Sequence, residues 1–155
     1  MESAVKVASC ILNEMESLTT MKLQKLVYYS QALYLVEFGA PLFQDEIQAW
    51  ANGPVVRSLF DRHKGMFLVR SGYFGADTMA DLPDSEHAVV ATVIEKLGDL
   101  TGAQLSELTH GERPWLDARR GLAPRERSSN VITPKSMLCF YASPDCGNPL
   151  FRVPA

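Results

Sequence analysis

The side chains best suited to chemistry in this sequence gather between residues 22 and 31. Two polar rows at helical spacing run along this stretch: Lys22, Lys25 and Tyr29, and Gln24, Tyr28 and Gln31. A lysine and tyrosine face combines positive charge with large aromatic contact area, which suits the binding of a protein partner. The alternative is a solvated face beside core tyrosines. The candidate partner-binding residues are therefore Lys22, Lys25, Tyr28, Tyr29 and Gln31.

Glu46 and Trp50 stand four residues apart, so on a helix they would share a face. Trp50 is typical of a core anchor whose indole N–H finds a nearby acceptor. Glu46 is a candidate for that acceptor, or for an ion pair with a lysine of residues 22–31.

His110 lies between Thr109 and Gly111, at the predicted end of a short helix. There an imidazole can bond free carbonyl groups and is favoured by the helix dipole. Since the sequence places no nucleophile near it, a structural role is favoured over a catalytic one.

No catalytic, metal or cofactor motif stands out. The three histidines and three cysteines are widely spaced, without a Cys-x-x-Cys or His-x-x-x-His pair. The GPVV stretch at 53–56 is typical of a turn and not of a phosphate-binding loop. The arginines between 119 and 127 are most simply a solvated loop. We therefore expect no catalytic residues, no metal and no cofactor, and a protein that is not an enzyme.

The composition fits one globular domain of 155 residues, with 46% hydrophobic and 21% charged residues. A net charge of -3 makes nucleic acid an unexpected partner and gives no attraction to anionic membranes. No apolar run approaches the ~20 residues that cross a bilayer. The acidic N-terminus does not resemble a signal peptide, so a cytoplasmic location is expected.

The elements that position these residues are mainly helical. Apolar periodicity and capping residues predict helices at 4–16, 21–38, 55–63, 84–97, 101–110, 113–120 and 134–141. Residues 46–51 fit a short helix or a strand, and residues 66–75 fit a small β-hairpin or a loop. We predict a mainly α fold, a compact single-domain bundle of about six to seven helices. The tail at 143–155 is expected to be extended or loosely held.

The motifs KLQKLVYYSQA, GAPLFQDEIQAWANGPVV and LTHGERPW, followed by a Thr-Pro-Lys helix, together resemble one family. It is the SocA-like Panacea domain, which includes phage-associated proteins of the GepA type. The resemblance runs from about Val5 to Tyr141. The family's signature positions fall on Lys22, Leu23, Lys25, Leu26, Glu46, Trp50, Gly53, Pro54, Val55, Thr109, His110, Pro114 and Trp115.

The resemblance implies an antitoxin domain at 1–142, followed by the tail, encoded beside a toxin in a bacterium or prophage. Its expected function is to neutralise a cognate toxin by direct protein–protein binding, with toxin-specific contacts in residues 67–83 and 145–155. Two alternatives stay open. One is an adaptor that delivers the toxin to an ATP-dependent protease. The other is an enzyme that acts on the toxin or its product through His110 or Glu46. The oligomeric state also stays open.

Overall fold

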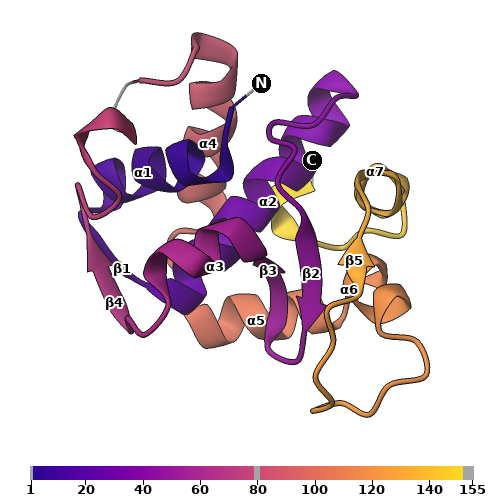
Figure 1. Ribbon diagram of the computed structural model, residues 1–155. Helices are drawn as coiled ribbons and strands as arrows, with labels where there is room; N and C mark the ends of the chain where they lie inside the picture. Colours follow the sequence, from indigo (N-terminus) through magenta and orange to yellow (C-terminus); the bar gives the residue numbers. More distant parts are fainter. Residues whose placement is uncertain (1, 79–80, 152–155) are drawn as a thin grey trace.

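The computed structural model describes residues 2–78 and 81–151, and within them the chain is mainly helical (Figure 1). This confirms the mainly α bundle expected from the sequence. The helices are α1 (Ala4–Met15), α2 (Thr20–Phe38), α3 (Arg57–His63), α4 (Asp84–Leu97), α5 (Gly102–His110), α6 (Arg113–Ala118) and α7 (Pro134–Tyr141). The strands are β1 (Ser17–Thr19), β2 (Ile47–Trp50), β3 (Gly53–Val56), β4 (Leu68–Arg70) and β5 (Val131–Ile132), and 3₁₀ turns occur at Ala76–Thr78 and Pro149–Phe151.

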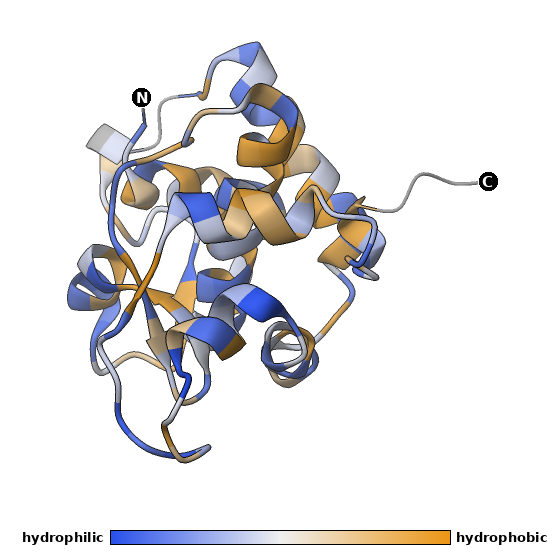
Figure 2. Cartoon of the chain, turned by 90° about the vertical axis from the view of Figure 1, so that its right-hand side faces the viewer, coloured by the Kyte–Doolittle hydropathy of each residue, from blue (hydrophilic) through white to orange (hydrophobic). Residues whose placement is uncertain are grey.

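Helix α2 is the centre of the fold, and α1, α4, α5, α7 and β3 all contact it (Figure 1). It begins where the Thr19 hydroxyl accepts the Lys22 N–H at 3.2 Å, and it ends at Gly39 in the left-handed conformation. Figure 2 shows hydrophobic segments where the helices meet and hydrophilic segments on the outer turns. Because α2 is covered on several sides, its polar side chains must find partners inside the protein.

A three-stranded antiparallel sheet, in the order β3-β2-β5, lies beside α2. β2 and β3 form a hairpin in which Trp50 pairs with Gly53. Of the two structures that fit residues 46–51, the strand forms, so Glu46 and Trp50 do not share a helix face. The next helix begins at Arg57 and not at Val55, because residues 53–56 are taken up by β3.

The hairpin considered for residues 66–75 does not form. β4 pairs instead with β1, in antiparallel register with Thr19 opposite Leu68. This register places Leu18 opposite Val69, and both side chains are buried. The pairing joins segments about fifty residues apart, so it depends on burial in the shared core and not on a local turn.

The tail is packed as far as Phe151, which differs from the loosely held segment expected. Leu150 is buried, and the Phe151 ring stacks on Tyr141 with centroids 4.8 Å apart. The Asn148 side chain donates a 2.8 Å hydrogen bond to Glu112. These contacts anchor a segment whose prolines suggested little structure. No helix in the described ranges is both long and apolar enough to span a membrane.

Candidate functional site

The predicted partner-binding residues do not form an exposed surface. Lys25, Tyr28, Tyr29 and Gln31 are 2%, 1%, 0% and 2% exposed, and Lys22 is half-buried. The expectation of an accessible lysine and tyrosine face is therefore wrong. The polar rows instead hold together the segments that surround α2.

Lys25 is the centre of this arrangement. Its ammonium donates a 3.1 Å hydrogen bond to the carbonyl of Pro54, and burial lowers its pKa to about 7. Gly53, with a φ of +118°, lies against the lysine stem and the Thr109 hydroxyl. Three sequence motifs, far apart along the chain, thus meet at one buried point.

The two glutamines of α2, Gln24 and Gln31, form hydrogen bonds with the main chain before β2 and at the end of β3. Gln31 accepts the N–H of Leu42 at 2.7 Å and donates to the carbonyl of Phe43 at 2.7 Å. Gln24 accepts the N–H of Val56 at 2.9 Å, and its amide nitrogen lies 3.0 Å from His63 Nε2. Burial lowers the pKa of His63, which favours the neutral ring in this contact. Both glutamines therefore satisfy main-chain groups that would otherwise be buried without partners.

Glu112 accepts hydrogen bonds from residues of α2, of α7 and of the C-terminal tail. It accepts from Tyr29 at 2.6 Å, from Tyr141 at 2.8 Å and from Asn148 at 2.8 Å. Tyr28 joins the cluster through a 2.9 Å contact between its hydroxyl and that of Tyr141. Burial raises the pKa of Glu112, while the three donors oppose that shift. Sequence reasoning did not single out Glu112, which is part of the LTHGERPW motif. Its partners lie 29 to 83 residues away along the chain, so no local spacing predicts these hydrogen bonds.

His110 ends α5, as expected, and its ring stacks on Trp115 with centroids 4.1 Å apart. The Trp115 indole donates to the carbonyl of Trp50 at 2.8 Å. Arg119 covers the Trp115 ring and donates to the carbonyl of Ala49, so this arginine is buried and not part of a solvated loop. Burial lowers the pKa of His110. These contacts join α5 and α6 to the β2–β3 hairpin.

The acceptor of the Trp50 indole is Gln48, at 2.9 Å, and not Glu46. Glu46 accepts from the Gln48 amide at 3.0 Å. Neither lysine bonds Glu46, since Lys25 donates to Pro54 and Lys22 donates to the carbonyl of Gly98. Trp50 is half-buried, with its ring 4.8 Å from that of Phe60.

An open groove of about 770 Å³ lies beside Trp50 and Phe60. Arg57, Lys64 and Arg127 also line it, which gives an aromatic wall and three cationic side chains. Such a groove can receive an apolar side chain together with an acidic one.

A second accessible feature is a set of exposed apolar residues on the two chain segments that meet where β1 pairs with β4, here called the Phe67 patch: Met21, Met66, Phe67 and Leu68. These side chains are 37%, 43%, 78% and 42% exposed. Their backbone is held firmly: Thr20 donates from its N–H to the carbonyl of Phe67 at 2.9 Å and from its hydroxyl to that of Met66 at 3.0 Å. The patch therefore presents apolar side chains on an ordered edge.

One group of side chains in the described ranges could hold a metal ion, and it shares no residue with either surface. Cys10 and Glu14 of α1 and His87 of α4 have ligand atoms within 4.8 Å of one another. The expectation of no metal site considered only spacing along the chain, whereas helix packing brings Cys10 close to His87. The one local signal is the spacing of Cys10 and Glu14, which places both on one helix face.

A comparison with protein families matches residues 23–116 to the family described as antitoxin SocA-like, Panacea domain. The match covers more than half of the chain and confirms the resemblance seen in the motifs. It is narrower than the span from Val5 to Tyr141, and it contains the segments that meet around Lys25. Comparisons with curated proteins and with solved structures returned no match.

Proposed function

The chain belongs to the SocA-like, Panacea-domain antitoxin family, and from that premise we propose that it neutralises a cognate protein toxin by binding it directly. In this proposal the signature residues build the scaffold, and the toxin contacts an exposed surface. The observation that supports it most is the Phe67 patch.

Phe67 has the properties of an interface anchor. Aromatic side chains carry much of the binding energy at protein interfaces, and a rigid presentation reduces the entropy lost on binding. Thr20 holds the backbone on either side of Phe67 through two hydrogen bonds. The groove offers three cationic side chains, Arg57, Lys64 and Arg127. We therefore propose a toxin surface that presents an apolar segment to the Phe67 patch and acidic groups to the groove.

Binding without catalysis is the second part of the proposal. Burial lowers the pKa of Lys25 and raises that of Glu112, and both side chains are engaged in hydrogen bonds. A general acid or base must reach its substrate, and neither side chain is accessible. Their burial supports a structural role for the residues that most resemble catalytic groups.

The proposal is tested by expressing the chain with the product of the adjacent gene and measuring affinity for that toxin. We expect Phe67→Ala to weaken binding by at least about 30-fold, the loss typical of an interface anchor. Phe38→Ala is the matched control, because Phe38 is also an exposed phenylalanine, at 49%, but lies at the far end of α2. Unchanged affinity in folded Phe67→Ala would exclude the patch as the toxin site.

A titration separates the proposed mechanism from its alternatives. Direct neutralisation requires about one antitoxin per toxin, whereas an enzyme would protect at substoichiometric amounts. An adaptor would lose protection in a host that lacks its ATP-dependent proteases. Protection that persists in such a host, at one-to-one stoichiometry, supports direct binding.

A further inference from the structure

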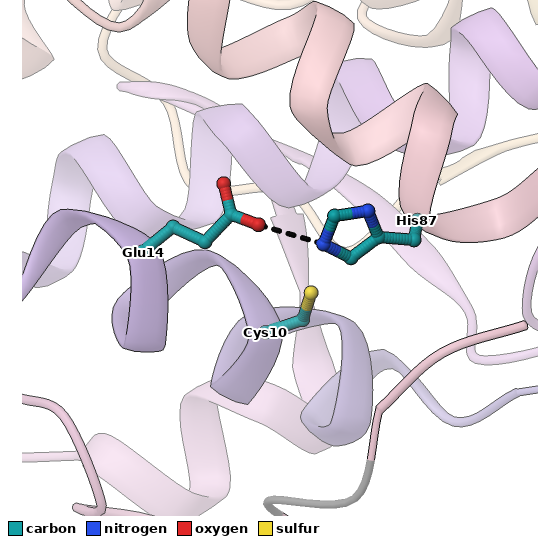
Figure 3. A group of neighbouring side chains, drawn as sticks. All are labelled: Cys10, Glu14 and His87. Carbon is teal, nitrogen blue, oxygen red and sulfur yellow. Dashed lines mark ion pairs between the residues drawn. The ribbon is translucent and has the colours of Figure 1, made fainter. Parts of the chain in front are cut away.

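Cys10, Glu14 and His87 bring three kinds of metal-binding atom together where α1 lies beside α4 (Figure 3). Cys10 and Glu14 lie one turn apart on α1, and His87 lies in the first turn of α4. The Nε2 atom of His87 is 2.7 Å from a carboxylate oxygen of Glu14. In Figure 3 the Cys10 sulfur points toward the same space. The three side chains come from two elements that are distant in sequence, so the fold itself creates the cluster.

The sulfur, oxygen and nitrogen ligands of this cluster are those that Zn²⁺ binds in proteins. Thiolate, imidazole and carboxylate are the three protein ligands that Zn²⁺ takes, usually in a tetrahedral arrangement. Donors around tetrahedral zinc lie about 3.4 Å apart, given metal–ligand distances of roughly 2.0–2.3 Å. Ligand atoms already within 4.8 Å of one another reach that spacing by small side-chain rotations. A water molecule would complete the fourth position of a bound zinc ion.

A metal ion would have to displace the proton of Cys10. Burial, and after it the charges of Glu14 and Asp81, raise the pKa of the Cys10 thiol to about 11, so the thiol is protonated near neutral pH and metal binding should strengthen as the pH rises. A bound divalent ion would be balanced by one thiolate and one carboxylate, with the imidazole neutral. On binding, the thiol proton passes to solvent.

We propose that Cys10, Glu14 and His87 form a zinc-binding site that clamps α1 to α4. α1 and α4 both contact α2, so the ion stabilises the packing of the N-terminal helix. The site is independent of toxin binding, because it shares no residue with the Phe67 patch or the groove. The ion binds the folded chain and not the separated helices, so it raises stability by mass action.

The first test is a titration of the chelator-treated full-length protein with Co²⁺, a spectroscopic substitute for zinc. We expect thiolate-to-cobalt charge transfer in the near ultraviolet and tetrahedral bands in the visible, both abolished by Zn²⁺. Cys10→Ser should lose the charge-transfer band, and His87→Gln should weaken cobalt binding at least about tenfold. Cys139→Ser is the matched control, because Cys139 is exposed on α7 and outside the cluster, and it should keep the band.

The second test is thermal unfolding with and without Zn²⁺. At a zinc concentration about 100 times Kd, the midpoint of the wild type and of Cys139→Ser should rise by roughly 5–10 °C. Cys10→Ser and His87→Gln, confirmed as folded by circular dichroism, should show no such rise. The proposal is overturned if the wild type gives no charge-transfer band, if Cys10→Ser keeps it, or if Cys139→Ser loses it.

Discussion

A Cβ atom placed on Gly53 would lie 2.6 Å from Cε of Lys25, so the glycine leaves the space that the lysine stem fills. The same Cβ would lie 3.0 Å from the Thr109 hydroxyl. This close contact joins a lysine of α2, the Gly-Pro turn that begins β3 and a threonine of α5. Each of the three segments limits the residue types that the other two can carry.

Gly53→Ala should therefore destabilise the protein by about 2–4 kcal/mol, since it adds overpacking to an unfavourable positive φ. The measurement is the free energy of unfolding in urea. Gly65→Ala is the control, because Gly65 also has a positive φ, +87°, but nothing lies within 4 Å of its added Cβ. Equal losses in the two variants would show that the contact with Lys25 contributes nothing.

Lys25 should make stability rise with pH between about 7 and 10. Its pKa is about 7 in the folded chain and near 10.5 when exposed, so the unfolded chain binds more protons across this window. Below pH 7 Lys25 is charged in both states, so the full cost of burying that charge lowers stability. Between pH 7 and 10.5 the folded chain loses the proton while the unfolded chain keeps it, and this cost is removed. Relative to Lys25→Met, the unfolding free energy of the wild type should rise by up to about 1.4 kcal/mol per pH unit. Urea unfolding at pH 6, 7, 8 and 9 measures this difference, and parallel curves would contradict the shift.

Glu112→Ala should cost more than about 3 kcal/mol of stability. The change leaves two tyrosine hydroxyls and the Asn148 amide buried without their acceptor. Chemical denaturation provides the measurement. Glu95→Ala on the exposed face of α4 is the control and should change stability by less than about 0.5 kcal/mol. A small loss at Glu112 would mean that water replaces the carboxylate.

Local features of the chain are well predicted from sequence, and the buried network is not. Thr133 caps the last helix as its Thr-Pro-Lys sequence predicts, because capping depends on residues only three positions apart. The polar rows of α2 suggest a solvated face because helical periodicity assumes that polar residues meet water. Gln24 and Lys25 instead bond main-chain groups about thirty residues away, and no local pattern reports such partners.

In the candidate site too, long-range contacts could not be predicted from the sequence. Lys25, Gly53 and Thr109 belong to three separate motifs that meet in the structure, and burial makes them a scaffold and not a contact surface. Phe67 lies at the start of the segment 67–83 expected to carry toxin contacts, but nothing in the sequence marks Phe67 itself, because its exposure depends on the long-range pairing of β1 with β4. Prediction therefore fails wherever a side chain's role depends on which distant segment covers it.

His110→Phe should leave toxin neutralisation intact at one-to-one stoichiometry. Phenylalanine keeps an aromatic ring against Trp115 but removes the titratable nitrogens, so it separates packing from chemistry. Growth rescue and isothermal titration against the purified toxin provide the two measurements, with circular dichroism to confirm the fold. His110→Ala, which removes the stacked ring, should lower stability by about 1–2 kcal/mol without abolishing binding. A folded His110→Phe variant that binds the toxin but no longer protects cells would contradict neutralisation by binding and favour the enzymatic alternative.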